Sequence, residues 1–324
     1  MHLNNNLPDV SVIIPCFNAG KFLGRTIDSV LGQTGVKLEI IVVDDGSTDE
    51  SIVILENYRG RIRLLRKENA GVSLARNDGL RMATGRYVRF LDADDEFVQE
   101  SLSEMLNIAE QRPGTACIGK AKLLRNGSSC VKSLTYDIPF SGSSGSSVPA
   151  VRLLCQPTQV SLMLLPRSLI NSKFSADSQF GEEFQFVRKM VESGLEFRFA
   201  NLPVVSIRDH DGHRLSQNAT ETSHIAQIKA VKQSAKVILD LVIDDPIARQ
   251  SLGTFCWARA RDCFRMGWRQ PAQEYLQVAR SLGGSEVLAG SKSYKFLLAI
   301  MGPRMAEAFL QFIKVLLAHS SGSR

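Results

Sequence analysis

The sequence predicts an α/β protein with a mostly parallel, Rossmann-like central sheet flanked by helices, followed by an α-helical C-terminal region. Buried-looking strands alternate with helices along the first part of the chain, an order that implies right-handed crossovers and a parallel sheet. Polar clusters follow several of these strands directly, and in open α/β sheets ligands bind at the carboxyl ends of the strands. From about residue 221 the apolar residues keep a helical spacing.

Each element follows from a local pattern. Strands are predicted where β-branched and other apolar residues run together, at residues 10–15, 38–43, 62–65 and 87–91. Helical spacing of apolar residues predicts helices at residues 21–33, through Ile52 and Leu55, and at residues 74–83. In the second half, residues 116–124 and 130–134 are predicted sheet segments separated by the turn dipeptide Asn126-Gly127.

Carboxylates gather after the strand at residues 87–91, where Asp92, Asp94 and Asp95 lie within four positions. Clustered carboxylates repel one another, and a cation would relieve that repulsion. Their hard oxygens suit Mg²⁺, Mn²⁺ or Ca²⁺, and a metal held by one or two carboxylates is often completed by substrate phosphates. In the alternative interpretation, the aspartates cap a helix that starts near Phe97.

Two further polar clusters favour a site over simple capping. Asn18 follows the first strand, and Asp44 and Asp45 follow the second, so all three clusters should meet along one edge of the sheet. Neither GxGxxG nor GxxxxGK[ST] follows the first strand, which argues against dinucleotide-binding and P-loop proteins.

Four stretches, in order, carry a resemblance to a known family: VSVIIPCFN at residues 10–18, IVVDDGSTD at 41–49, NAGVSLARNDG at 69–79 and FLDADD at 90–95. Together they resemble the family 2 glycosyltransferases, inverting enzymes with the GT-A fold, over about residues 10–216. The resemblance implies that the following residues bind a nucleotide sugar: Pro15, Phe17, Asn18, Asp44, Asp45, Arg76, Asn77, Asp92 and Asp95.

The same resemblance implies finer roles. Asp45 or its neighbour Asp44 accepts a hydrogen bond from the base of the nucleotide, and Arg76 lies near that base or the diphosphate. Asp92 and Asp94 form the DxD pair that holds Mn²⁺ or Mg²⁺, with Asp94 the expected direct ligand. Asp95 contacts the sugar. The alternative for Arg76 is a surface position, and for Asn77 and Gly79 it is helix packing.

The resemblance also implies a catalytic base near residues 179–183. The family carries Glu-Asp there, whereas this chain has Glu182 and Glu183, so Glu183 is the predicted base and Glu182 the alternative. Inverting transfer needs a carboxylate that deprotonates the acceptor hydroxyl. Alternatively, both glutamates are acidic residues in a first helical turn. The family's downstream arginine corresponds to Lys189, with Arg188 beside it, and His210 is a predicted metal or diphosphate contact.

These features predict a divalent-metal-dependent inverting glycosyltransferase. It would move a sugar from a nucleoside diphosphate sugar, with a UDP-sugar favoured, to a hydroxyl of a glycan or lipid-linked acceptor. One alternative is a non-catalytic GT-A-fold protein that binds nucleotide or glycan, and another is a nucleotidyltransferase. The serine- and glycine-rich residues 141–147 are either a surface insertion or a lid near the acceptor.

Domain organisation follows from the same patterns. The 324 residues are 44% hydrophobic and 22% charged, which is ordinary globular composition. A catalytic domain is predicted at residues 1–220, with a nucleotide-binding half at about 8–112 and an acceptor half at about 113–220. A helical region follows at residues 221–324, including a helical hairpin at 252–282.

Localisation is predicted from cysteine usage and charge. The six cysteines form no CxxC pair, the N-terminus lacks a signal peptide, and no run is long enough to span a bilayer, which predicts a cytoplasmic protein. Basic residues outnumber acidic ones by 14 to 7 in residues 222–324. A solvated basic face is expected rather than nucleic-acid binding. The amphipathic residues 305–318 are either a packed terminal helix or an interfacial helix on the inner face of the membrane.

Overall fold

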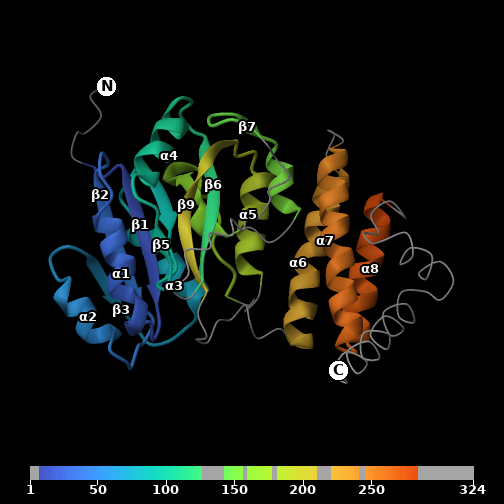
Figure 1. Ribbon diagram of the computed structural model, residues 1–324, viewed down its shortest axis with the longest axis horizontal. Helices are drawn as coiled ribbons and strands as arrows, with labels where there is room; N and C mark the ends of the chain where they lie inside the picture. Colours follow the sequence, from blue (N-terminus) through green and yellow to red (C-terminus); the bar gives the residue numbers. More distant parts are fainter. Residues whose placement is uncertain are drawn as a thin grey trace, which may run out of the picture. The chain divides into compact units, whose positions relative to one another are not determined.

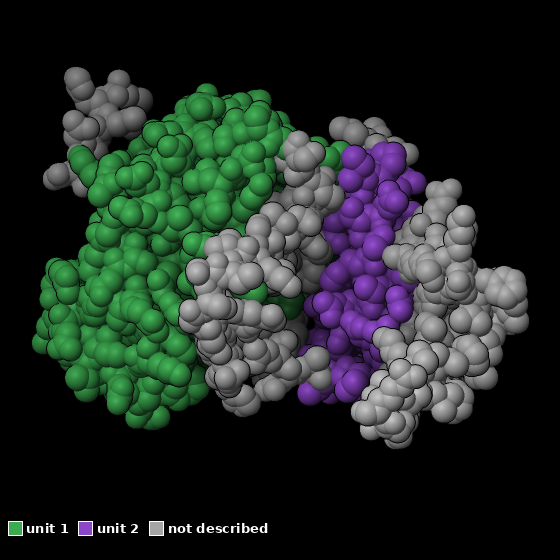
Figure 2. Space-filling view, in the orientation of Figure 1, with its two compact units in different colours: residues 1–153, 157–214 green, residues 154–156, 215–324 purple. Residues whose placement is uncertain are grey.

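The computed structural model describes residues 7–125, 142–155, 159–176, 181–209, 220–240 and 245–283. It divides into two compact units, residues 1–153 with 157–214 and residues 154–156 with 215–324 (Figure 2). The sequence pattern places this boundary at residue 220. The first unit contains every described residue that the motifs single out.

The nucleotide-binding half is built on four parallel strands. These are β1 (Val10–Cys16), β2 (Leu38–Asp44), β3 (Arg63–Arg66) and β4 (Tyr87–Phe90). Parallel pairing joins β1 to β2, β1 to β4 and β2 to β3. The side chains of β1 and β4 are buried on both faces, as expected for a sheet covered on both sides. The carboxyl ends of β1, β2 and β4 therefore lie along one edge.

Three helices connect these strands: α1 (Gly20–Leu31), α2 (Ser51–Asn57) and α3 (Val72–Met82). α3 packs on β1 and β2, and this approach depends on Gly79. A Cβ atom at Gly79 would lie 2.3 Å from the Cγ2 atom of Ile13. The glycine therefore lets α3 lie close against the sheet, which fixes the position of Arg76 on the same helix.

The remaining strands make the sheet mixed. They are β5 (Glu96–Phe97), β6 (Ala116–Arg125), β7 (Ser147–Val148), β8 (Met163–Pro166) and β9 (Phe197–Asp209). The order along the sheet is β3-β2-β1-β4-β8-β6-β9-β5, with β7 beside β9. β8 is antiparallel to both β4 and β6, and β6 is parallel to β9 (Figure 1). The predicted segment at 116–124 is confirmed, and the one at 130–134 lies outside the described residues, as do Asn126-Gly127.

Short helical turns and two further helices lie between these strands in the sequence. They are the 3₁₀ turns η1 (Ala150–Leu154), η2 (Val160–Leu162) and η3 (Arg167–Leu169), and the helices α4 (Ser101–Glu110) and α5 (Glu182–Glu192). α4 packs on β6 and β9. Of the serine- and glycine-rich loop, residues 142–147 are described and end in β7.

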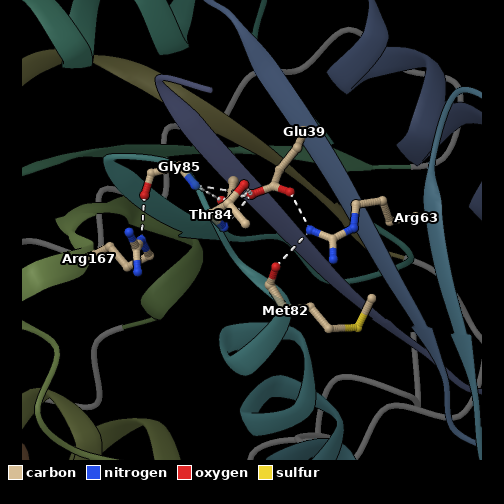
Figure 3. Close-up of polar contacts among 7 residues, drawn as sticks. Glu39, Arg63, Met82, Thr84, Gly85 and Arg167 are labelled. Carbon is tan, nitrogen blue, oxygen red and sulfur yellow. Dashed lines mark hydrogen bonds and ion pairs between the residues drawn. The ribbon is translucent and has the colours of Figure 1, made fainter. Parts of the chain in front are cut away.

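A half-buried carboxylate fixes the turn between α3 and β4. Glu39 on β2 accepts hydrogen bonds from Ser11, from the backbone and hydroxyl of Thr84 and from the Gly85 backbone, and it pairs with Arg63 at 2.7 Å (Figure 3). Burial alone would raise the pKa of Glu39, but these bonds lower it to about 2. The turn that leads from α3 into β4 is therefore fixed to β1 and β2.

The second unit is a helical assembly of α6 (Glu221–Asp240), α7 (Pro246–Arg265) and α8 (Arg269–Gly283). α8 packs on both α6 and α7. The Asp245 carboxylate caps α7 by accepting from the Ala248 N–H at 3.0 Å. Ile225 and Leu239 of α6 are each 38% exposed, whereas Ile228, Val231 and Ile238 on the same helix are buried.

No helix among the described ranges is both long enough and apolar enough to cross a bilayer. Residues 305–318, the predicted terminal amphipathic helix, lie outside those ranges, so both interpretations of that segment stay predictions.

Candidate active site

The loops after β1 and β2 are joined through Asn18. Its backbone lies in the left-handed region at φ 48°, a conformation that asparagine tolerates. The Asn18 Oδ1 atom accepts from the Thr48 N–H at 2.8 Å, and its N–H donates to the Ser47 Oγ atom at 3.0 Å. Beside it, the Phe17 ring is 52% exposed, whereas Pro15 is buried within β1. Phe17 is thus available at the sheet edge to contact a ligand.

The two aspartates after β2 organise neighbouring loops. Asp44 Oδ1 accepts from the Ser47 N–H at 3.0 Å. The Asp45 carboxylate accepts from the backbone N–H groups of Ala70 and Gly71 at 3.0 and 2.7 Å. Both aspartates are buried. Asp45, one of the two residues predicted to accept a hydrogen bond from the nucleotide's base, therefore holds the turn that starts α3.

The acidic stretch after β4 does not cap a helix. Phe97 lies in β5, and α4 begins at Ser101 after the N-cap residue Glu100. The capping alternative for these aspartates is therefore wrong. Instead, the buried Asp95 carboxylate accepts from the Arg208 N–H at 3.1 Å, which links this stretch to β9.

One buried guanidinium connects the acidic stretch to α5. Arg76 Nη2 lies 2.9 Å from Asp92 Oδ1 and 2.6 Å from Glu183 Oε1, and Arg76 Nη1 lies 3.3 Å from Glu182 Oε1. The Arg76 side chain is only 4% exposed, so it is not the surface position of the alternative interpretation. The structure thus brings together Arg76, Asp92 and both glutamates from three distant parts of the sequence.

Electrostatics at this cluster favour proton exchange near neutral pH. Burial raises the pKa of Glu183 to about 7, while Arg76 opposes this rise and the charges of Asp92 and Glu182 add to it. Burial also raises the pKa of Glu182. Glu183 Oε2 accepts from the Val160 N–H at 3.0 Å. A carboxylate with a pKa near the working pH is suited to general base catalysis.

Aromatic residues pack against the cluster. The Phe174 ring stacks on Phe186 of α5 at 4.1 Å, and the Arg76 guanidinium lies over the Phe174 ring at 5.3 Å. The Asn77 side-chain amide donates to the Phe174 carbonyl and accepts from its N–H, both at 2.9 Å. These contacts match the packing alternative for Asn77, and its contact with a nucleotide sugar stays a prediction.

Sequence reasoning did not identify Val160 and Phe174. Val160 contributes a backbone N–H, which any residue except proline carries, and Phe174 lies in a polar stretch without periodicity. Among the predicted residues, His210 lies outside the described ranges. Arg188 pairs with Glu192 on its own helix.

A divalent metal fits the chemistry of the acidic edge. Within the described ranges, no three His, Cys, Asp or Glu side chains come together as a ready-made metal site. A cation completed by phosphate oxygens needs only one or two protein carboxylates. The half-buried Asp94 offers hard oxygen ligands there, and Asp92 offers a second carboxylate that it shares with Arg76. The donor set therefore suits Mg²⁺ or Mn²⁺.

The fold is that of the GT-A class. The crystal structure of residues 1–349 of Staphylococcus aureus TarS in complex with UDP-GlcNAc matches 94% of this chain and 91% of the TarS chain, with a TM-score of 0.69 and 20% identity. This likeness confirms the predicted α/β architecture with its helical C-terminal region.

Sequence comparison relates part of the chain to one family. The model described as glycosyl transferase family 2 matches residues 11–128. The chain is 44% identical over 108 residues to the uncharacterized glycosyltransferase YibD of Escherichia coli (strain K12), which covers 32% of this chain and 31% of YibD. It is 38% identical over 131 residues to the poly(ribitol-phosphate) beta-N-acetylglucosaminyltransferase TarP of Staphylococcus aureus (strain N315), covering 39% and 40%. The matched stretch thus spans less than half of each relative. Residues 11–128 are therefore similar in sequence to family 2 glycosyltransferases.

Proposed function

We propose that the chain is an inverting glycosyltransferase that moves a sugar from a nucleoside diphosphate sugar to an acceptor hydroxyl. The observation that carries this proposal is the shared guanidinium of Arg76. Its Nη2 atom lies 2.9 Å from the Asp92 carboxylate at the predicted donor edge. The same atom lies 2.6 Å from the carboxylate of Glu183, the predicted catalytic base. The predicted donor edge and the predicted proton acceptor thus contact the same guanidinium, which supports the proposal.

A UDP-sugar is the favoured donor. TarS, which shares the fold, has been crystallised with UDP-GlcNAc and with UDP. The exposed Phe17 ring and the loops held by Asn18, Asp44 and Asp45 would surround the nucleotide. Asp94, with Asp92, would hold Mn²⁺ or Mg²⁺, which stabilises negative charge on the departing diphosphate when bound.

Glu183 supplies the base. Its carboxylate takes the proton of the acceptor hydroxyl as that oxygen attacks the anomeric carbon from the face opposite the leaving diphosphate. Glutamate reaches one methylene further than the family's aspartate, and here both of its oxygens are held, one by Arg76 and one by the Val160 N–H. Glu182, whose contact with Arg76 is the longer at 3.3 Å, is the alternative base.

The acceptor is proposed as a hydroxyl of a glycan or a lipid-linked glycan. The name of the relative TarP describes transfer to a poly(ribitol-phosphate) polymer, and such a polymer is one member of the acceptor class that a hydroxyl-activating carboxylate can serve. With a lipid-linked acceptor, residues 305–318 would contact the inner face of a membrane peripherally.

Calorimetric titration tests the donor and the metal together. The protein is titrated with UDP-, GDP- and dTDP-sugars in Mn²⁺ and in chelator, beside Asp94→Ala and the exposed control Glu104→Ala. We expect metal-dependent binding of a UDP-sugar that Asp94→Ala abolishes and Glu104→Ala leaves intact. Equal affinity in chelator would refute the metal. Failure to bind any nucleotide sugar would favour a non-catalytic protein with this fold.

A further inference from the structure

Arg89 is a buried cation that the motifs do not explain. It lies in β4, three residues before Asp92, and its side chain is fully buried. No carboxylate of the described residues forms an ion pair with it. The titratable group that acts on it is the Cys117 thiol, and burial raises the pKa of that thiol to about 12, so the thiol is neutral. An unpaired buried charge costs folding free energy, so its presence calls for another explanation.

Backbone carbonyls and one aromatic ring surround the guanidinium instead. Arg89 Nε and Nη2 donate to the Ser161 carbonyl at 3.3 and 3.2 Å, and Nη2 also donates to the Val204 carbonyl at 3.1 Å. The guanidinium lies over the Phe97 ring at 4.0 Å. Arg89 thereby joins β4 to η2 and β9, which are distant in the sequence, and to β5, which follows β4 closely.

The contact with η2 leads directly to the proposed base. Ser161 follows Val160, whose N–H donates to Glu183 Oε2 at 3.0 Å. The Val204 carbonyl has other donors, the Ser101 hydroxyl and the Val98 N–H, both at 3.2 Å. Within the described part of the chain, the Ser161 carbonyl accepts its hydrogen bonds from Arg89. Arg89 thus contacts the turn beside Glu183 through the Ser161 carbonyl.

We propose that Arg89 is a positioning residue for the base: it fixes the Ser161 carbonyl and so keeps the Val160 N–H directed at the Glu183 carboxylate. This inference rests on the proposed role of Glu183. The groups that face Glu183 are Arg76 on α3, Asp92 after β4, Glu182 on α5 and the Val160 N–H of η2. Only the last of these depends on Arg89.

Two variants remove the link at different points. Arg89→Met keeps most of the side-chain volume but cannot hold the Ser161 carbonyl, and replacing a buried ion by an apolar side chain often leaves folding intact. Val160→Pro deletes the N–H itself. The backbone at Val160 is compatible with proline because Val160 opens a 3₁₀ turn and Gln159 before it is extended, at φ −75° and ψ 133°. The ring Cδ atom takes the place of the amide hydrogen, so it also forces the Glu183 Oε2 atom, 3.0 Å from that nitrogen, to move.

The expected result separates positioning from folding. The Val160 N–H lowers the pKa of Glu183. Both variants should therefore move the limb of the pH–rate profile in which the rate rises as Glu183 loses its proton to higher pH. A lost hydrogen bond to a charged group corresponds to a fall of about ten- to a hundredfold in kcat, with little change in KM for the donor. The double variant should lose no more than Val160→Pro alone, since both changes remove one interaction. Arg89→Lys should restore part of kcat.

Turnover of a UDP-sugar is measured for these variants beside Leu106→Ala, a core change in α4 that should lower thermal stability and leave the pH limb in place. The inference is overturned if wild-type turnover depends on Glu183 but Arg89→Met leaves both kcat and the limb unchanged, or if the double variant shows additive losses. If Arg89→Met does not fold, the Val160→Pro variant still tests the inference. A pH–rate profile of Val160→Pro in which the limb set by Glu183 stays in place would overturn it. Turnover that persists in the Glu183→Gln variant would instead contradict the assignment of Glu183 as the catalytic base.

Discussion

Replacing Arg76 by methionine removes the guanidinium that Asp92, Glu182 and Glu183 share. Methionine keeps much of the contact with the Phe174 ring, so the change is mainly electrostatic. The three carboxylates would then face one another inside the protein without a cation. Removing one partner of a buried ion pair typically costs about 3–5 kcal/mol of the free energy of unfolding, and we expect a loss of that size at pH 8.

An exposed arginine provides the matched control. Arg86 also contacts two carboxylates, Asp9 at 2.8 Å and Glu110 at 2.6 Å, but its side chain is 47% exposed against 4% for Arg76. Exposed ion pairs contribute about 0–1 kcal/mol. Arg86→Met should therefore cost far less than Arg76→Met, although each of the two arginines pairs with more than one carboxylate.

The pH dependence follows from the pKa of Glu183. A carboxylate whose pKa is raised in the folded state destabilises the fold as it ionises, so its stability contribution is present below about pH 4.5 and lost as the pH rises through about 7. Without Arg76 the carboxylates should be protonated at still higher pH. The deficit of Arg76→Met relative to wild type should thus be largest at pH 8 and shrink towards pH 5.

The two units allow an internal check on this measurement. Both tryptophans of the chain, Trp257 and Trp268, lie in the helical unit. Urea unfolding followed by circular dichroism reports on both units, whereas tryptophan fluorescence reports on the helical unit. Arg76→Met should shift the first and leave the fluorescence transition in place. Equal losses for Arg76→Met and Arg86→Met, or a deficit independent of pH, would refute the reasoning.

Three further predictions concern other parts of the chain. First, kcat/KM should rise with pH through about pH 7 as Glu183 loses its proton, and residual turnover of Glu183→Gln should lack this limb. Second, Gly79→Ala should lower the melting temperature, because its Cβ would lie 2.3 Å from Ile13 Cγ2. Such overpacking costs about 1–3 kcal/mol of the free energy of unfolding. Gly24→Ala, whose Cβ would meet its nearest neighbour at 3.7 Å, should not lower the melting temperature. Third, burial lowers the pKa of His224 below 6.5, so the helical unit should lose stability as the pH falls below that value. Fluorescence-detected urea titrations at pH 7.5 and 5.5 test this, and an unchanged midpoint would contradict it.

Much of the nucleotide-binding half could be predicted because local patterns decide it. β1, β2 and β4 are short apolar runs, and the polar residues after them lie at the sheet edge through topology alone. The second half carries weaker signals. β5 and β7 have two residues each, too few for a period, and β8 owes its antiparallel place to pairing with strands far away in the sequence.

The site was predictable in its residue types and less so in its geometry. The motifs indicated Arg76, Asp92 and Glu183 separately, but sequence spacing does not reveal that one guanidinium joins them from distant parts of the chain. Main-chain groups such as the Val160 N–H have no sequence signature. Arg89 gave no signal either, because an arginine in a strand is usually expected to reach solvent.

The most direct test of Glu183 as the base of sugar transfer compares wild type with Glu183→Gln in two measurements on the same preparations. UDP release from a panel of UDP-sugars reports turnover, and calorimetry reports the Kd for UDP. We predict a loss of turnover of about 10²–10⁴-fold with the Kd for UDP unchanged. Turnover equal to that of the wild type would contradict the assignment of Glu183 as the base.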